Sequence, residues 1–590
     1  MRTDRKIATG LTALVLLLAG LPVMAQEAKV PVKEVTLDNG LKLLMVVRHE
    51  SPTVSGGWVA HVGSVNERPG ITGIAHLFEH MMFKGTETIG TKDYSKEKPI
   101  IAHLDAIRQQ MEKEYAKLRA AKRRGEIQGN IYAPENETDE LKTLRAEMKK
   151  LQDQEHALIK KDELDKIYTE NGASGLNAFT DYDMTTYFVT VPSNKLELWF
   201  WMESDRLLHP VFREFYSERD VVREERRMRV ESDPIAKYEE QYDSMFWTSV
   251  PYHHPVIGWP SDVESISRQE ADQFFATYYA PNNITVALVG DFEPEEAVTF
   301  AKKYLSRIPR GAHEPPPIVT QEIPQLEERR MSAEAETNPT VEIRWHTVPF
   351  VSKDKAAVQI MADLLNGRTG RLYKSLVESK HVASGEPYAW SRAMKYAGAF
   401  EIGAEVADGH THQEVEDALL AEISRLQSEP VGDHELQKVK NQSLADSYRR
   451  LRSNFYLMLQ LLIYDAEGDW HALNDMPGRL QAVTADDVMR VAKAYFTPTG
   501  RNVMWYSRKA GTEEDPELAA LEGKARLAAK QMLAQIGQVN DPSQLQQIIT
   551  KLDASKDQAP PEFKPAVELV LKRARERLEK LSSAATGKEK

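Results

Sequence analysis

The sequence predicts an α+β protein made of two related halves, each of which combines helices with a mixed sheet. Strand-like alternation and helix-like periodicity follow one another along the chain, two similar segments recur in its two halves, and a proline-rich stretch lies between them. Of its 590 residues, 41% are hydrophobic and 28% are charged. That composition supplies enough apolar material for several cores and excludes global disorder.

The composition also excludes several classes of function. A formal net charge of −13 disfavours a nucleic-acid partner, because a surface of that sign repels phosphate groups. The absence of cysteine rules out disulfides, thiol catalysis, iron–sulfur clusters and cysteine-ligated zinc. Any metal ion must therefore be held by His, Asp or Glu.

Residues 1–25 have the three-part pattern of a secretory signal peptide, with a basic start, an apolar run and small residues before Gln26. We expect cleavage near Gln26, no membrane attachment of the mature chain, and a periplasmic or secreted location, most simply in a bacterium. The alternative is an uncleaved anchor, since residues 7–25 are almost long enough to span a bilayer.

The N-terminal domain, residues 26–310, begins with a predicted β-hairpin. Residues 35–37 and 41–47 alternate in polarity around an Asp-Asn-Gly turn, which is a strong hairpin signal. A third strand is expected over residues 58–62. A helix is expected over residues 71–83, where it ends at a Lys-Gly pair.

A helical insertion is expected within this domain at about residues 100–165. This segment is rich in charged helix formers, and its apolar residues recur at steps of three and four on both sides of a stretch with Gly and Pro, 125–139. The pattern predicts an antiparallel helical hairpin that projects from the domain. Its charged faces are expected to be solvated surface rather than a binding site.

The second half repeats features of the first. Residues 274–290 and 491–507 share a helix end, a turn with proline and an apolar strand. The segments predicted after the first domain are a linker (311–325), a homologous domain (326–510) and a charged helical tail (511–590). The last stretch of the tail, residues 580–590, is expected to be disordered.

The sequence His76-Leu77-Phe78-Glu79-His80 lies inside the helix expected over residues 71–83. Positions i and i+4 of a helix share one face, so both imidazoles can reach one metal ion, and Glu79 faces the same side. Zinc suits imidazole and carboxylate ligands and imposes little geometric demand. The alternative is a helix that carries two surface histidines.

Two histidines need a third protein ligand, which in a chain without cysteine should be a carboxylate on another element. A later helical stretch offers Glu225, three and four residues after Val222 and Val221 and therefore expected on the buried side, with Glu224 as the second choice. Glu218 lies about two turns earlier, too far to bind the same ion, and is expected to support the site from behind. The alternative is a solvated charged helix.

Three segments together resemble the pitrilysin/insulinase zinc metallopeptidases, whose His-x-x-Glu-His inverts the thermolysin-type order. They are GITGIAHLFEHMMFKGT (70–86), NGASGLNAFTDYDMTTYFVTVPSN (171–194) and ERDVVREE (218–225), and a weaker resemblance covers about residues 33–510. It implies a clamshell-type fold of two halves. It further implies one zinc ion bound by His76, His80 and Glu225, Glu79 as the general base, and Glu218 as a supporting residue.

The resemblance also assigns a substrate-binding strand. Asn177, Ala178 and Thr180 match the family's edge-strand segment, which implies backbone pairing with an extended peptide. The implied activity is that of a zinc-dependent endopeptidase acting on peptides or unfolded polypeptide segments. The competing hypothesis is a non-catalytic core or peptide-binding chaperone subunit on the same fold, and the complete set of metal-site residues favours the enzyme.

The second half departs from the family's pattern. The family normally carries an Arg there and, seven residues on, a Tyr that holds the substrate near the zinc, whereas this chain has Val377 and Ser384. Tyr388 and Arg371 are the nearest replacements, and neither is in register. Family members that work as pairs of similar chains divide these duties. We therefore expect a similar partner chain, in a heterodimer or a homodimer.

Two other histidine pairs are weaker candidates for a metal site. His410 and His412 would have to act as an i, i+2 pair on a strand, but they lie in a polar, turn-like stretch. His253 and His254 precede a proline in an expected loop, where a structural or substrate-lining role is favoured over metal binding.

Overall fold

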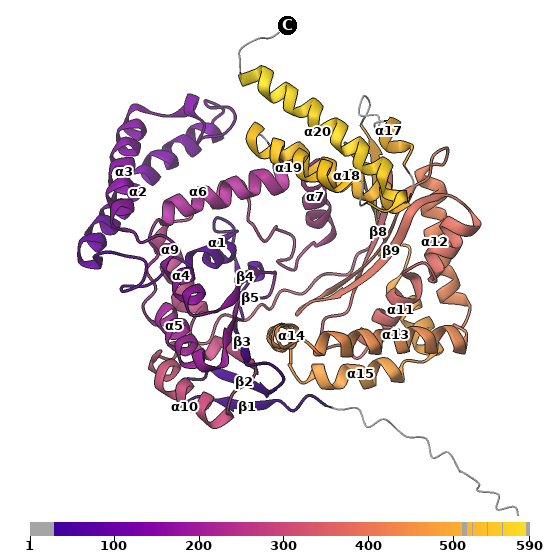
Figure 1. Cartoon of the computed structure of the whole chain (residues 1–590), viewed down its shortest axis with the longest axis horizontal. Coiled ribbons are helices and arrows are strands. Elements are labelled where there is room, and N and C mark those ends of the chain that lie inside the picture. Colours follow the sequence, from indigo (N-terminus) through magenta and orange to yellow (C-terminus); the bar gives the residue numbers. More distant parts are fainter. Residues whose placement is uncertain (1–28, 510–515, 522, 540, 557–558, 586–590) are drawn as a thin grey trace, which may run out of the picture.

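Two β-sheets form the centre of the molecule (Figure 1). The computed structural model describes residues 29–509, 516–521, 523–539, 541–556 and 559–585. The predicted signal peptide, residues 1–25, lies outside the described residues. None of the described helices combines the length and the apolar character that a membrane span needs.

The two sheets have the same strand order once β1 is set aside. The first consists of β1 (Lys33–Thr36), β2 (Lys42–Val47), β3 (Thr53–Ala60), β4 (Ser174–Thr180), β5 (Thr185–Pro192) and β6 (Ile284–Gly290). The second consists of β7 (Arg329–Ala335), β8 (Thr340–Thr347), β9 (Ala383–Ala393), β10 (Gly398–Val406) and β11 (Asn502–Arg508). Their orders are β1-β2-β6-β3-β5-β4 and β7-β11-β8-β10-β9.

Strand directions repeat as well. β2 runs parallel to β6, as β7 does to β11, and all other neighbours in both sheets are antiparallel. The predicted sequence repeat corresponds to α9 (Arg268–Tyr278) followed by β6, and to α16 (Ala485–Tyr495) followed by β11. The predicted α+β fold with two homologous halves is therefore confirmed.

Helices cover the outer faces of both sheets and form the insertion and the tail. The other helices of the first half are α1 (Ile74–Met81), α2 (Tyr94–Arg123), α3 (Asp139–Leu158), α4 (Glu163–Glu170), α5 (Leu196–Leu208), α6 (Phe215–Arg226), α7 (Ala236–Phe246), α8 (Pro260–Val263) and α10 (Pro294–Tyr304). Those of the second half are α11 (Lys355–Leu365), α12 (His412–Ser428), α13 (Asp433–Leu451), α14 (Asn454–Glu467) and α15 (Ala472–Ala482). The tail contains α17 (Pro516–Ala519), α18 (Gly523–Gln538), α19 (Pro542–Ser555) and α20 (Lys564–Ala585).

Several element boundaries differ from the prediction. β1 and β2 form the expected hairpin, with Gly40 at φ 91° in its turn. β3 begins at Thr53, before the predicted 58–62, because its Ser-Gly-Gly start is held between β5 and β6 despite a low strand propensity. α1 is shorter than the predicted 71–83, because Gly73 precedes it with a φ of 91° that a helix does not allow.

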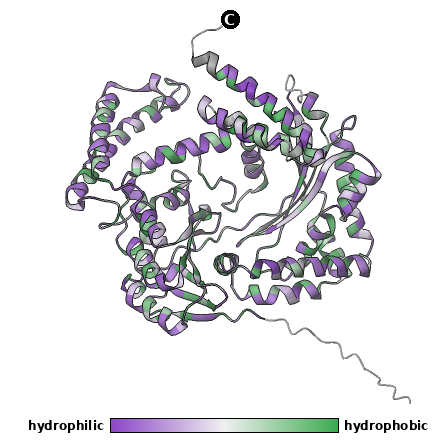
Figure 2. Cartoon of the chain, viewed as in Figure 1, coloured by the Kyte–Doolittle hydropathy of each residue, from purple (hydrophilic) through white to green (hydrophobic). Residues whose placement is uncertain are grey.

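The insertion forms a helical hairpin of α2 and α3, at the left of Figure 1. α2 starts before residue 100, where the charged composition begins. Apolar residues spaced at three and four, including Met111 and Tyr115 on α2 and Leu144 and Met148 on α3, are buried. Figure 2 shows hydrophobic and hydrophilic residues alternating along both helices, as expected for a pair that buries one stripe and exposes the other.

Each half supplies a helix to the sheet of the other half. α14 of the second half packs Leu457, Met458, Leu461 and Leu462 against the first sheet. α7 of the first half reaches the second sheet, where the buried Tyr242 hydroxyl donates to the Asn502 carbonyl at 2.8 Å. α14 covers the face of the first sheet that the first half's own helices leave open, and α7 covers the corresponding face of the second sheet.

A buried carboxylate strengthens the contact of α14 with the first sheet. Asp465 accepts hydrogen bonds from the Lys42 ammonium at 2.7 Å and the Thr285 hydroxyl at 2.5 Å, and His61 lies 3.3 Å away. Burial alone would raise the pKa of Asp465, but these partners outweigh it and lower that pKa to about 2. The carboxylate therefore stays ionised, and it links the two halves electrostatically.

The linker and tail differ partly from expectation. Residues 308–328 form neither helix nor strand. Within them, the Glu322 carboxylate accepts from the backbone N–H groups of Thr248 and Val250. α18, α19 and α20 bury a small apolar core of their own. The prediction of disorder from residue 580 was wrong up to Ala585, because α20 continues to that residue. Residues 586–590 lie outside the described residues.

Candidate metal centre

The helix α1 is fixed at its start by a buried carboxylate. Glu67 accepts from the Gly73 N–H and the Ala75 N–H, both at 2.8 Å. These N–H groups have no partner inside the helix, so the buried Glu67 side chain satisfies both of them. One side of α1, including Leu77 and Phe78, is buried in the first core. The opposite side carries the two histidines and Glu79.

The two imidazoles of α1 meet Glu225 of α6. The Nε2 atoms of His76 and His80 lie 3.8 and 3.4 Å from Glu225 Oε2. One donor atom from each residue lies within 4.8 Å of the other two. Among the described residues, these three are the one group of three or more His, Asp or Glu side chains with the geometry to hold a metal ion. The structure thus brings the three predicted ligands together.

Part of the reasoning that selected Glu225 was wrong. Val222 is buried as expected, but Val221 is 50% exposed, so α6 buries a narrower face than the two valines indicated. Glu225 follows Val222 by three residues and sits at the margin of that face, turned toward α1. Glu224 points away into solvent and pairs with Arg227 at 2.6 Å.

Glu218 orients one of the two imidazoles. Its Oε1 lies 2.9 Å from His80 Nδ1, and its Oε2 lies 2.5 Å from the Lys84 ammonium. The contact fixes Nδ1–H as the donor and leaves Nε2 to face Glu225. The expected supporting position of Glu218 agrees with this geometry. His76 has no such support, since its buried Nδ1 lacks a hydrogen-bond partner among the described residues.

The surroundings of the site shift the pKa values of the two histidines in opposite directions. Burial and the neighbouring His80 lower the pKa of His76 to about 4. Burial also opposes a charge on His80, but Glu218 and Glu225 outweigh it and raise the pKa of His80 to about 9. Burial alone would raise the pKa of Glu218, but His80 and Lys84 outweigh it and lower that pKa to about 2. Without a metal ion, His80 is therefore a cation between two carboxylates.

This donor set fits zinc. Two imidazole nitrogens and one carboxylate oxygen, with room for a further ligand, match the composition of catalytic zinc sites. His76 is neutral over the physiological range, and a divalent ion can replace the proton that His80 holds at Nε2. The residues present would therefore accept the ion that the sequence predicts.

Glu79 and a sheet edge share a cavity with the three donors. This cavity has a volume of about 800 Å³ and is also lined by residues 177–180 of β4 and by residues 255–257. Burial raises the pKa of Glu79. β4 is the last strand of its sheet, so its outer backbone groups are not paired with another strand of that sheet. The predicted Asn177, Ala178 and Thr180 all lie on this stretch.

Models of one peptidase family match both halves of the chain. The insulinase model (peptidase family M16) matches residues 43–105 and 156–258, and the model described as the M16 inactive domain matches residues 265–443. The chain belongs to the pitrilysin/insulinase family. Residues 106–155, between the two segments matched by the insulinase model, lie entirely within the α2–α3 hairpin.

Relatives within the pitrilysin/insulinase family cover most of the chain. The zinc protease PqqE of Helicobacter pylori is 24% identical over 499 residues, which are 83% of this chain and 96% of that protein. The solved structure of a protease from Helicobacter pylori has a TM-score of 0.65 at 22% identity and covers 81% of this chain and 100% of that one. The periplasmic protease PqqL from Escherichia coli has a TM-score of 0.61 at 18% identity, covering 85% of this chain and 50% of that one. At such identities the structural likeness establishes the fold.

Three histidines of the two weaker pairs, His412, His253 and His254, make other contacts in the structure. His412 is the first residue of α12 rather than part of a strand, and its Nε2 lies 2.7 Å from the Tyr506 carbonyl oxygen. His254 is buried beside the N-terminal end of α1, with its Nδ1 3.8 Å from Glu67. His253 contacts the Val250 carbonyl oxygen.

The family's Arg and Tyr positions are occupied by residues with structural contacts. Val377 packs against the second core, and Ser384 lies on β9. Of the nearest replacements, Arg371 forms a two-pronged ion pair with Glu435. Tyr388 donates its hydroxyl proton to Glu401 at 2.8 Å. The second half therefore offers neither side chain in the family's position.

Sequence reasoning missed the contacts that hold α6 in place. The Glu155 carboxylate of α3 accepts from the Glu214 N–H at 2.9 Å, at the start of α6, where Glu214 adopts φ 55°. Gln152 of α3 donates to the Ser217 hydroxyl at 3.2 Å. The insertion hairpin thus helps to position the helix that carries Glu218 and Glu225. No local pattern signals such long-range partners.

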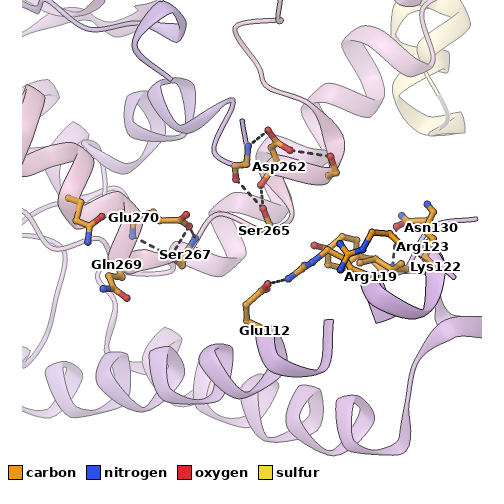
Figure 3. Close-up of a pocket in the computed structure, with 15 residues that line it drawn as sticks. Glu112, Arg119, Lys122, Arg123, Asn130, Asp262, Ser265, Ser267, Gln269 and Glu270 are labelled. Carbon is orange, nitrogen blue, oxygen red and sulfur yellow. Dashed lines mark hydrogen bonds and ion pairs between the residues drawn. The ribbon is translucent and has the colours of Figure 1, made fainter. Parts of the chain in front are cut away.

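A larger cavity lies between the hairpin and α8–α9, away from the three donors (Figure 3). Its volume is about 1020 Å³. Its charged residues are largely paired with near neighbours: Arg119 with Glu112, and Asp262 with the Thr72 hydroxyl. Lys122 donates to the Gly129 carbonyl. These charged side chains are therefore already satisfied by contacts within the chain.

We expect Glu225→Gln to weaken zinc binding by more than about 100-fold, because it removes the anionic ligand. Loss of a residue that only supports a ligand typically weakens metal binding by about 10–100-fold. Glu224→Gln, one residue away and exposed, should bind zinc as the unchanged chain does. A competition titration against a chelating dye measures both. Equal affinities for the two variants would contradict the assignment of Glu225.

We expect zinc binding near pH 7.5 to release at least the one proton that His80 holds. His80, with its pKa raised to about 9, is protonated there, and His76, with its pKa lowered to about 4, is not. Zinc affinity should therefore fall as the pH drops below 9. Titration of the chelator-treated protein in weak buffer with a pH indicator measures the release. Glu218→Gln should reduce it, and zinc uptake without any proton release would contradict the charge state of His80.

Proposed function

We propose that this chain is a zinc-dependent endopeptidase that hydrolyses peptides or unfolded polypeptide segments. The observation that carries the proposal is the convergence of two imidazole nitrogens and a carboxylate oxygen within 4.8 Å, in a cavity that also contains Glu79 and an unpaired strand edge. His76, His80 and Glu225 would hold one zinc ion. When bound, the zinc ion would act as a Lewis acid that lowers the pKa of water and polarises a carbonyl group.

Glu79 acts as the proton carrier in this proposal. Its carboxylate borders the cavity beside both histidines, and burial moves its pKa upward toward the range suited to a general base. Glu79 takes a proton from the attacking water and delivers it to the departing amine. Glu218 holds the His80 ring in orientation throughout, through its contact with Nδ1.

The edge of β4 selects an extended substrate. A peptide that pairs with Asn177, Ala178 and Thr180 must have free backbone N–H and C=O groups on one side. A polypeptide already folded into helices or sheet interiors lacks these groups. Short peptides and unfolded segments are therefore the expected substrates, with their scissile carbonyl brought toward the three metal donors.

The competing function is that of a non-catalytic core or peptide-binding chaperone subunit. The description "inactive domain" applies to the family model matched by residues 265–443, outside the segments that contain the proposed metal site. The first half retains His76, Glu79, His80 and Glu225 together, and a subunit that only bound peptides would have no use for Glu79 in this position. This set supports the enzyme.

A similar partner chain is part of the proposal. The chain spans 50% of the solved PqqL chain from Escherichia coli, and Val377 and Ser384 occupy the family's Arg and Tyr positions. A homologous subunit, in a heterodimer or homodimer, would supply what this chain lacks. We also propose a periplasmic or secreted location for the mature chain, in line with the signal-like residues 1–25 and with the periplasmic location of PqqL from Escherichia coli.

We expect Glu79→Gln to retain zinc and to lower kcat by about 10²–10⁴-fold, the range for removal of a general acid–base. His80→Ala should lose both zinc and turnover. Elemental analysis combined with hydrolysis of a quenched fluorescent peptide measures the two properties separately. A normal rate for Glu79→Gln would remove the general-base assignment, and zinc without any hydrolysis in the unchanged chain would favour the chaperone function.

We expect the chain to cleave peptides faster when mixed with a homologous chain that carries the Arg and Tyr. Those side chains would hold the substrate near the zinc, where the present chain has Val377 and Ser384. The rate is measured for each chain alone and for the mixture at equal total concentration. An equal rate for the isolated chain and the mixture would refute the need for that partner.

A further inference from the structure

An arginine contacts the proposed metal ligand Glu225 from the side opposite the histidines. Arg229 Nη1 lies 2.9 Å from Glu225 Oε1, whereas the imidazoles face Glu225 Oε2. The two oxygens of this carboxylate thus have different partners. Arg229 holds Glu225 in an orientation that directs one oxygen to the metal site.

Arg229 reaches the site from a π-helical turn. The turn, η4 (Arg227–Glu231), continues directly from α6, and turns of this kind are frequent at functional sites. It places Arg229 and Val230 on the wall of the 800 Å³ cavity. Arg227, two residues before Arg229, does not line that cavity and instead pairs with Glu224.

Most of the guanidinium remains accessible. The Arg229 side chain is 72% exposed, and a guanidinium carries five N–H donors, of which the contact with Glu225 occupies one nitrogen. The remaining donors can take the planar, two-pronged contact with a carboxylate that arginine favours. No other Arg or Lys lines this cavity. The cavity is also lined by the apolar residues Val230, Pro255, Val256 and Ile257.

The charges of the loaded site favour an anionic ligand. A divalent ion and one guanidinium exceed the two carboxylates of Glu79 and Glu225 by one positive charge when both imidazoles are neutral. An ion at Glu225 Oε2 also draws that carboxylate's charge away from Arg229. An anionic group on a peptide that pairs with β4 would meet this excess positive charge within the cavity.

We propose that Arg229 makes the site selective for peptides that carry a carboxylate close to the bond to be cleaved. This inference rests on the proposed peptidase function and names its substrate class. The carboxylate can come from an acidic side chain or from the peptide's C-terminus, and Arg229 would bind both in the same way. The apolar residues that line the same cavity favour a peptide that also carries a hydrophobic residue.

Binding to the Glu79→Gln variant tests the proposal without requiring hydrolysis. The probes are three fluorescent peptides, measured by anisotropy with zinc in excess: alternating Val-Glu with blocked ends, alternating Val-Gln with blocked ends, and the Val-Gln peptide with a free C-terminal carboxylate. We expect the first to bind about tenfold more tightly than the second, the scale of one hydrogen bond to a charged group. The third shows whether a terminal carboxylate serves as well as a side chain.

Arg229→Gln in the same background should bring the Val-Glu and Val-Gln affinities to within about twofold of each other, and Arg229→Lys should keep part of the preference. Arg227→Gln is the matched control, since it removes an exposed arginine of the same turn that lies outside the cavity. It should leave the preference intact. A preference that survives Arg229→Gln, or none in the parent variant, would overturn the inference.

Zinc content and hydrolysis separate this inference from the proposed function. If the unchanged chain binds zinc and prefers the Val-Glu peptide but cleaves none of the three, alone or mixed with the homologous chain that carries the Arg and Tyr, the peptidase proposal fails while the role of Arg229 in binding stands. If it cleaves Val-Gln and Val-Glu peptides with equal kcat/KM, the peptidase proposal stands and the inference about Arg229 fails.

Discussion

The contact between α1 and α6 is the constraint on which the site depends. His80 and Glu218 are 138 residues apart in sequence, and the hydrogen bond between them brings one helix's imidazoles against the other helix's carboxylates. The partly buried charges of this pair and of Lys84 stabilise one another, and removal of any one of them would leave its partners less well compensated. The helices must therefore be held at a fixed distance and rotation.

Several elements outside the site maintain that fixed arrangement. Glu67 caps the start of α1, and Glu155 of the insertion holds the start of α6. The fully buried pair of Arg213 and Glu97 ties the root of α2 to the loop after α1, where Arg213 also donates to the Thr86 carbonyl at 2.6 Å. The insertion is thus integrated with the family's core rather than attached to its surface.

The sequence allowed the fold class to be predicted, because strand alternation, helical periodicity and the repeat are local features of the chain. Helical spacing places His76 and His80 on one face, and the need for a third ligand points to an acidic helix. Glu225 lies beside both imidazoles although Val221 is exposed, and its role as the third ligand stays a prediction. The partners Glu67 and Glu155 could not be predicted, because their contacts join segments with no local pattern in common. The exchange of α7 and α14 between the halves was missed for the same reason.

The free edge of β4 has a consequence for how tightly any strand can be held there. An open edge that binds peptides can also pair with the sheets of other molecules, and proteins usually prevent this pairing by covering the edge. In this chain the register of β4 shifts between Ser174 and Asn177, and Gly175 has a φ of 68°. The regular part of the edge is therefore confined to residues 177–180. So short a stretch forms only a few backbone hydrogen bonds with an added strand. This favours rapid release of the bound peptide and disfavours growth of fibres.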